Sequence, residues 1–129
     1  MEAKLIQNKS LKNGLTVQLL DASRPIAGDR WFVSVLARME VPVTLETLGN
    51  TRNLDLDLNE VLDLLGGTVL FEQKQERNFI GITEKEGVME KMMSSFSALA
   101  ESYFSHPEFA GNYILKQFME MKKRQSWYP

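Results

Sequence analysis

The strongest strand signal in the sequence is "DRWFVSVLARMEVPV", residues 29–43. Its odd-numbered positions from Trp31 to Val41 are apolar, whereas its even-numbered positions, from Phe32 to Glu40, are mixed. A period of two among β-branched and aromatic residues is typical of a strand with one buried face. The stretch therefore predicts a long strand that ends at Pro42 and turns its odd-numbered side chains into the core.

The segment before this strand predicts a hairpin. In "KLIQNKSLKNGLTVQLLD", residues 4–21, apolar residues lie on both sides of Asn13-Gly14. Both residues tolerate the positive φ of a two-residue turn, and this dipeptide is the strongest short-range hairpin signal. We expect strands over residues 4–11 and 15–21.

The connection "SRPIAGDRW", residues 23–31, joins this hairpin to the long strand. Its proline fixes one backbone angle and Gly28 permits a tight turn, so we expect a bend between two strands. The candidate binding residues of this stretch are Arg24 and Arg30. Arg77 and Asn78 are two further polar residues that we expect either to line a cleft with these arginines or to lie on a solvated strand.

The middle of the chain predicts a short helix and a strand. "TLETLGNTRN", residues 44–53, is typical of an irregular connection with at most one helical turn. Asp57 and Glu60 have the spacing of a capping box and Gly66 supplies a stop, so a helix is expected over residues 58–65. Residues 68–82 begin as a strand, and one strand and a second hairpin both remain open.

Two longer helices are expected after this strand. Thr83 with Glu86 has capping-box spacing for the first, and Ser105 with Glu108 for the second, which is expected to end near Arg124. The first carries apolar residues at helical spacing: Met89, Met92, Met93, Phe96, Leu99, Ala100 and Tyr103. This stripe predicts the face that packs on the sheet, with a dimer interface as the alternative.

These elements predict an α+β fold. It is a two-layer sandwich in which a roughly four-stranded, mainly antiparallel sheet is covered by one short and two longer helices. The sequence has 129 residues, of which 43% are hydrophobic, and this suits one core. We therefore expect a single domain over residues 1–129 with a short tail at about residues 125–129.

Composition and motifs exclude several kinds of chemistry. The chain has no cysteine, which removes disulfides, thiolate nucleophiles and Cys-ligated metals. Asp55, Asp57 and Asn59 resemble the start of a calcium loop, but Glu60 and Gly66 occupy the positions where that loop needs glycine and glutamate. No Gly-rich phosphate-binding motif occurs. We expect no catalytic residue, no metal and no cofactor.

Cations gather only near the C-terminus. The net charge of −2 creates no global field that attracts nucleic acid or an anionic membrane. Lys122, Lys123 and Arg124 nevertheless precede Trp127, and cations beside an aromatic ring can contact phosphate and stack on bases. A solvated helix end is the alternative. The single histidine, His106, lacks a paired catalytic motif and is assigned to a helix corner.

Three segments together, "SRPIAGDRW", "LLGGTVLFEQKQERNFI" and "SHPEF", resemble a family of small bacterial proteins with no assigned function. The resemblance implies a free-standing domain in a bacterial cytoplasm and carries over no site residue. A cytoplasmic location without membrane contact also agrees with the absence of a signal-peptide pattern and of any apolar window of ~20 residues.

Three functions follow from these observations. The first is a small non-enzymatic domain that contacts a protein partner or forms a homo-oligomer, because apolar residues occur on both faces of the Trp31 strand. The second is a polyanion-binding or nucleic-acid-binding module that uses the C-terminal cations with Arg24 and Arg30. The third is a small-molecule enzyme whose site no motif reveals.

Overall fold

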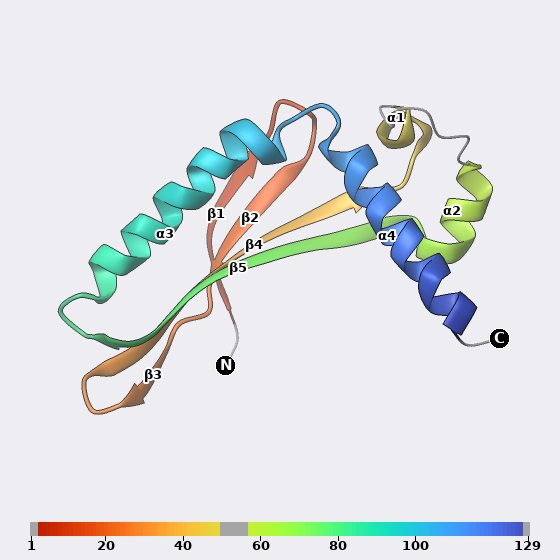
Figure 1. Ribbon diagram of the computed structural model, residues 1–129. Helices are drawn as coiled ribbons and strands as arrows, with labels where there is room; N and C mark the ends of the chain where they lie inside the picture. Colours follow the sequence, from red (N-terminus) through yellow and green to blue (C-terminus); the bar gives the residue numbers. More distant parts are fainter. Residues whose placement is uncertain (1–2, 50–56, 128–129) are drawn as a thin grey trace. The chain divides into compact units, whose positions relative to one another are not determined.

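The structure is a computed structural model that describes residues 3–49 and 57–127, without the side chain of Trp127. A mainly antiparallel open sheet is accompanied by helices, which confirms the predicted α+β class. The elements follow one another along the chain (Figure 1) as β1 (Lys4–Ser10), β2 (Thr16–Asp21), β3 (Arg24–Ala27), β4 (Arg30–Pro42), α1 (Leu45–Leu48), α2 (Leu58–Leu65), β5 (Thr68–Gly81), α3 (Lys85–Leu99), the π-helix η1 (Ala100–Phe104) and α4 (Phe109–Trp127).

The chain divides by its contacts into two compact units. The described residues of the first unit are 3–39 and 71–105, and those of the second are 40–49, 57–70 and 106–127. β4 and β5 contribute residues to both units. The expectation of a single domain over residues 1–129 stays a prediction.

Strand β3 continues β2 along one edge of β4. Val17 of β2 lies opposite Met39 of β4, and Arg24 of β3 lies opposite Phe32 of β4. Arg24 follows Val17 by seven residues and Phe32 precedes Met39 by seven, so β2 and β3 pair with β4 in one continuous antiparallel register. The intervening Ala22 also donates its N–H to a β4 carbonyl at 3.0 Å. The stretch that was predicted as a bend between two strands thus contains a strand of its own.

Strand β5 occupies the other edge of β4 and runs antiparallel to it. Arg38 Nε lies 2.8 Å from Glu72 Oε2, and Ser34 Oγ lies 3.4 Å from Glu76 Oε2. Ser34 precedes Arg38 by four residues in β4, and Glu76 follows Glu72 by four residues in β5, as an antiparallel pair requires. Residues 68–81 form one strand, which decides between the two alternatives left open by the sequence.

One face of the sheet in the first unit is covered by α3 and η1 (Figure 1). On the sheet side, the odd-numbered residues of β4 from 33 to 39 are buried, as predicted, and Trp31 is half-buried. On the helical side, Met92, Phe96 and Phe104 are buried, whereas Tyr103, predicted in the same stripe, is 54% exposed. The wider π-helical turn after Leu99 rotates the chain by about one residue, so Phe104 takes the inward position. Its ring meets that of Phe71 edge-on at 5.3 Å.

The loop between β1 and β2 is longer than predicted. The N–H of Leu11 bonds to the carbonyl oxygen of Leu15 at 2.8 Å, so three residues rather than two form the turn. Gly14 has a positive φ of 90°, but Asn13 does not share it. Asn13 Nδ2 instead donates to the carbonyl oxygen of Phe104 at 2.8 Å, which ties the hairpin to the end of η1.

The second unit contains α1, α2 and α4 with the adjoining ends of β4 and β5. Helix α2 has the predicted bounds, because Asp57 Oδ1 accepts the N–H of Asn59 and Gly66 ends the helix with a φ of 85°. Helix α1 is the single helical turn expected in this connection. Tyr113 of α4 donates its hydroxyl to the carbonyl oxygen of Leu70 at 2.8 Å, which fixes α4 against the start of β5.

The predicted starts of α3 and α4 are wrong in detail. Helix α3 begins at Lys85 without a side-chain cap, so Thr83 does not have the expected role. Ser105 donates its hydroxyl to a carbonyl of the preceding turn and does not cap α4. His106 Nδ1 accepts the N–H of Glu108 at 3.1 Å just before α4 begins, which agrees with its assignment to a corner.

Candidate functional site

The β3–β4 hairpin places Arg24 and Arg30 in the first unit. Ala27 lies opposite Arg30, so Gly28 and Asp29 form a two-residue turn. Gly28 has a positive φ of 58° at the first central position, as a type II′ turn requires. Arg24 pairs across the hairpin with Phe32, and Arg30 begins β4 at the turn.

Three cations of this region lie over aromatic rings. Arg24 Cζ is 5.2 Å from the ring centroid of Phe32, and Arg30 Cζ is 5.5 Å from that of Phe79. Lys85 Nζ, from the first turn of α3, is 3.7 Å from the Trp31 ring. Each such pair contributes about 0.5–1 kcal/mol at an exposed site and holds the cation in a fixed direction.

Exposed apolar side chains accompany these cations. Ile26, Phe79 and Ile82 are 42%, 62% and 54% exposed. The Arg30 guanidinium lies over Phe79, and a β-carbon added at Gly81, next to Ile82, would come within 3.1 Å of it. Ile26 belongs to the same hairpin, in β3. We call the set of Arg24, Ile26, Arg30, Phe79 and Ile82 the hairpin patch.

Phe79 has a strained backbone. Its φ of 59° lies in the left-handed region, and it is the one residue other than glycine with a positive φ in the described chain. Asn78 Oδ1 accepts the N–H of Phe79 at 3.0 Å and supports this conformation. The alternation of β5 breaks here, because Ile80 and Gly81 are both buried while the Phe79 ring points to solvent. Strain of this kind costs about 1–3 kcal/mol and persists where the surrounding structure enforces it.

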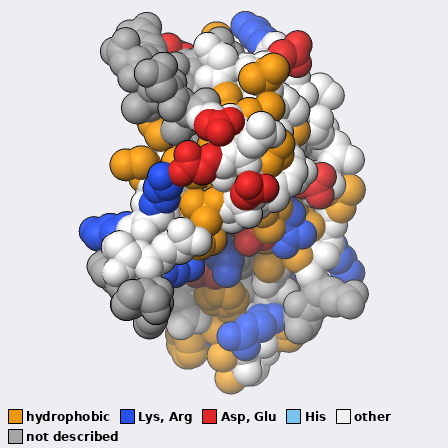
Figure 2. All heavy atoms as spheres, turned by 90° about the vertical axis from the view of Figure 1, so that its right-hand side faces the viewer, with side chains coloured by type: hydrophobic (Ala, Val, Ile, Leu, Met, Phe, Trp, Pro, Cys, Tyr) orange, Lys and Arg blue, Asp and Glu red, His pale blue; other side chains and the backbone are white. Residues whose placement is uncertain are grey.

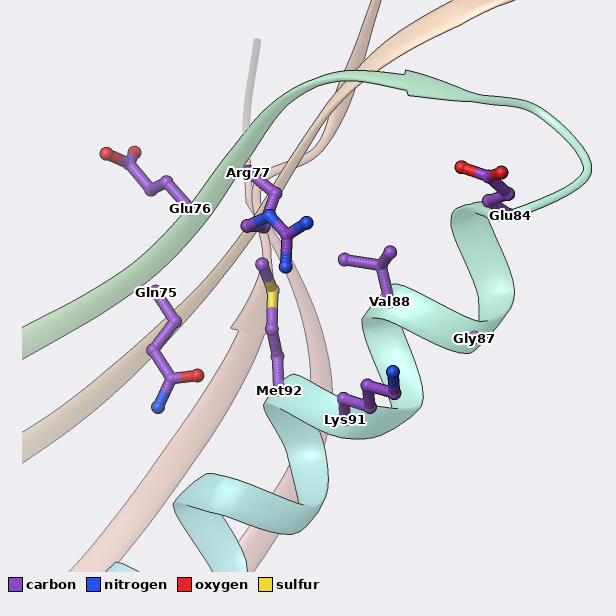
Figure 3. A pocket seen from close by; sticks show the side chains of 8 residues that line it. All are labelled: Gln75, Glu76, Arg77, Glu84, Gly87, Val88, Lys91 and Met92. Atoms are coloured by element: carbon purple, nitrogen blue, oxygen red, sulfur yellow. The ribbon is translucent and has the colours of Figure 1, made fainter.

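A groove of about 720 Å³ lies between β5 and α3 in the same unit (Figure 3). Arg77 projects from β5 toward α3, and Lys91 and Val88 line the groove from α3. The buried Met92 forms part of the lining, and Glu84 stands at one end. Glu76 points to the opposite side of β5, where Oε2 lies 3.4 Å from the Ser34 hydroxyl. Among the described residues, no carboxylate forms an ion pair with either cation of the groove.

The predicted polar cleft is therefore only partly correct. Arg77 does line a groove, together with Lys91, which the sequence did not single out. Asn78 supports Phe79 instead, and Arg24 and Arg30 contact the rings described above. The spacing of Arg77 and Lys91 along the chain carried no signal, because a strand and a helix supply one residue each.

The C-terminal cations belong to the second unit. Lys122 forms an ion pair with Glu60 of α2 and lies over the Phe118 ring at 5.0 Å. Lys123 and Arg124 are exposed in the last turns of α4, which continues to Trp127 beyond its expected end. The tail predicted from residue 125 is thus helical as far as the structure describes it. On the face shown in Figure 2, acidic and basic side chains lie among hydrophobic ones rather than in one block.

No group of three or more acidic or histidine side chains that could hold a metal ion occurs in residues 3–49 and 57–127. Asp55, part of the rejected calcium pattern, lies outside these residues. Within the same ranges, no helix is long and apolar enough to cross a membrane.

Comparison with known proteins gives no relative: no family model matches the chain, and neither the curated proteins nor the solved structures contain a significant match. The resemblance to a bacterial family and the cytoplasmic location stay predictions.

Proposed function

We propose that the protein is a non-enzymatic binding module that contacts a partner protein through the hairpin patch. The observation that carries this proposal is the Phe79 ring, which is 62% exposed and held in a strained conformation beside Arg30. Aromatic residues and arginines dominate the energetic centres of protein interfaces. An exposed ring that costs backbone strain agrees with a residue kept for contact with a partner.

The chemistry of the patch defines the partner. Phe79 and Ile82 offer apolar area, and Arg24 and Arg30 offer guanidinium groups that bind carboxylates in a fork geometry. The complementary surface therefore carries an apolar side chain flanked by aspartate or glutamate. In the isolated chain, Asp29 Oδ1 forms a long ion pair with Arg30 Nε at 3.7 Å. The partner's carboxylate replaces Asp29 at this guanidinium group.

A protein fits this patch better than a nucleic acid does. The Phe79 ring of the patch is faced by Arg30, and the neighbouring rings of Trp31 and Phe32 are faced by Lys85 and Arg24. A cation therefore already occupies one stacking face of each ring. The aliphatic Ile26 has no role in contacts with phosphate or bases. The net charge of −2 also gives no general attraction to a polyanion.

A partner other than a second copy is favoured by charge and by the sheet edges. A two-fold contact through this patch brings the arginines of both copies to one interface, which like charges oppose. Edge strand β1 is also poorly suited to pairing with another copy, because its register shifts between Leu5 and Gln7 and it carries the exposed Lys4.

Site-specific photo-crosslinking in the cell tests this proposal. A photoreactive phenylalanine analogue at Ile82 is expected to give one discrete adduct with another protein. The same analogue at the exposed Met119 of α4, outside the patch, is expected not to give it. Phe79→Asn removes the ring and introduces a residue that tolerates a positive φ, so it should abolish the adduct and leave the circular dichroism spectrum unchanged.

Three results overturn the proposal. An adduct with the mass of two copies identifies a homo-oligomer, and an adduct removed by nuclease identifies a nucleic acid. Equal labelling from Ile82 and Met119 shows that the hairpin patch is not a specific surface.

A further inference from the structure

We propose that the groove between β5 and α3 binds a small amphipathic carboxylate, a ligand with one acidic group on an unbranched apolar chain. This site is distinct from the hairpin patch and does not depend on the function proposed for it. Its volume of about 720 Å³ lies within the ~300–1,000 Å³ that small-molecule sites occupy.

Two cations supply the acid-binding end. Arg77 from β5 and Lys91 from α3 both line the groove, and no described carboxylate forms an ion pair with either of them. Both cations are exposed, so their charges are available to a ligand in the groove. Arg77 offers a guanidinium fork and Lys91 an ammonium group to the same groove, and both kinds of group bind carboxylate oxygens.

Apolar side chains supply the rest of the site. Met92 is 4% exposed and Val88 is half-buried, and both line the groove beside the cations (Figure 3). Methionine adapts its shape to varied apolar ligands. An alkyl chain that lies on these two residues can place its carboxylate at Arg77 and Lys91.

Glu84 and Gly87 set the selectivity. Glu76 and Glu84 both border the groove, but the Glu76 carboxylate points to the opposite side of β5. The Glu84 carboxylate therefore repels a second negative charge on the ligand, so a dicarboxylate should bind less well. Gly87 is the third residue of α3, in its first turn, and a β-carbon added there meets no atom within 4 Å. The missing side chain keeps one wall of the groove open.

Titration of the full chain with octanoate tests this inference. Chemical shifts of the Val88 and Met92 methyl groups should saturate with a Kd on the order of 1 mM, as expected for an open site and about ten heavy ligand atoms. Octanol and octanedioate, matched in chain length, should bind at least about fivefold more weakly, because one lacks the charge and the other carries a second.

Four variants make the test specific. Arg77→Gln and Lys91→Gln should each weaken octanoate binding about tenfold. Gly87→Leu should abolish it and raise the melting temperature, because leucine fills the groove and favours the helix. Lys74→Gln removes an exposed cation from the same strand outside the groove and should leave binding unchanged. Equal binding of octanol, or octanoate binding that survives both Arg77→Gln and Gly87→Leu, overturns the inference.

Discussion

Replacement of Phe79 by alanine and by glycine measures the strain in its backbone. Both changes remove a ring that is 62% exposed, together with its contact with Arg30. Only glycine also relieves the positive φ of 59°. This relief is worth about 1–2 kcal/mol for a residue with a β-carbon. The greater flexibility of unfolded glycine offsets about 0.5–1 kcal/mol of it. Phe79→Gly should therefore be more stable than Phe79→Ala by about 0.5–1 kcal/mol, the reverse of the usual order.

Urea unfolding followed by circular dichroism measures this difference. The matched control is Lys74, an exposed residue of β5 without a positive φ. There, Lys74→Gly should be less stable than Lys74→Ala by about 0.5–1 kcal/mol. If glycine is the less stable replacement at both positions, Phe79 is not strained, and the argument that its conformation is kept for a partner fails.

Three further predictions concern stability, and each is measured by urea unfolding. Gly66→Ala should destabilise the chain by about 1–3 kcal/mol because φ is 85° there. Gly67→Ala, at a negative φ with open space around it, should change stability by less than about 0.5 kcal/mol. Equal effects at the two positions contradict the claim that the positive φ of Gly66 ends α2. Phe96→Ala should cost about 3–5 kcal/mol, since the ring is fully buried, and a loss below about 1 kcal/mol shows that it is not in the core. Asn13→Ala should cost about 1–3 kcal/mol because it leaves the carbonyl of Phe104 without this donor; a neutral result indicates that water replaces the amide.

Elements set by local chemistry were predictable from the sequence. Alternating residues from Trp31 to Val41 define β4, and its odd-numbered residues from Val33 to Val41 are buried as expected, whereas Trp31 is half-buried. Asp57 and Gly66 set the two ends of α2 at the predicted residues. In each case the signal lies within the element itself or directly beside it, so neighbouring elements are not needed to interpret it.

Elements that depend on distant parts of the chain were not predictable. The π-helical turn at Ala100–Phe104 exchanges Tyr103 for Phe104 in the core, and no periodicity within the helix announces it. The amide of Asn13 bonds to a residue 91 positions away rather than favouring the two-residue turn. The groove likewise requires a strand and a helix to bring Arg77 and Lys91 together.

The candidate sites divide according to whether their residues follow or oppose local preferences. Lys122 and Arg124 lie near the C-terminal end of α4, where cations complement the helix dipole, so their position needs no ligand to explain it. Phe79 adopts a conformation that favours glycine, and Gly87 lies in the first turn of α3, where a residue with a β-carbon loses less backbone freedom on folding than glycine does. Departures from local preference are expected where function requires them. The C-terminal cations, the most conspicuous cluster in the sequence, are therefore explained by their place at a helix end. Phe79 and Gly87, which local chemistry disfavours at their positions, lie in the hairpin patch and in the groove, the two proposed binding surfaces.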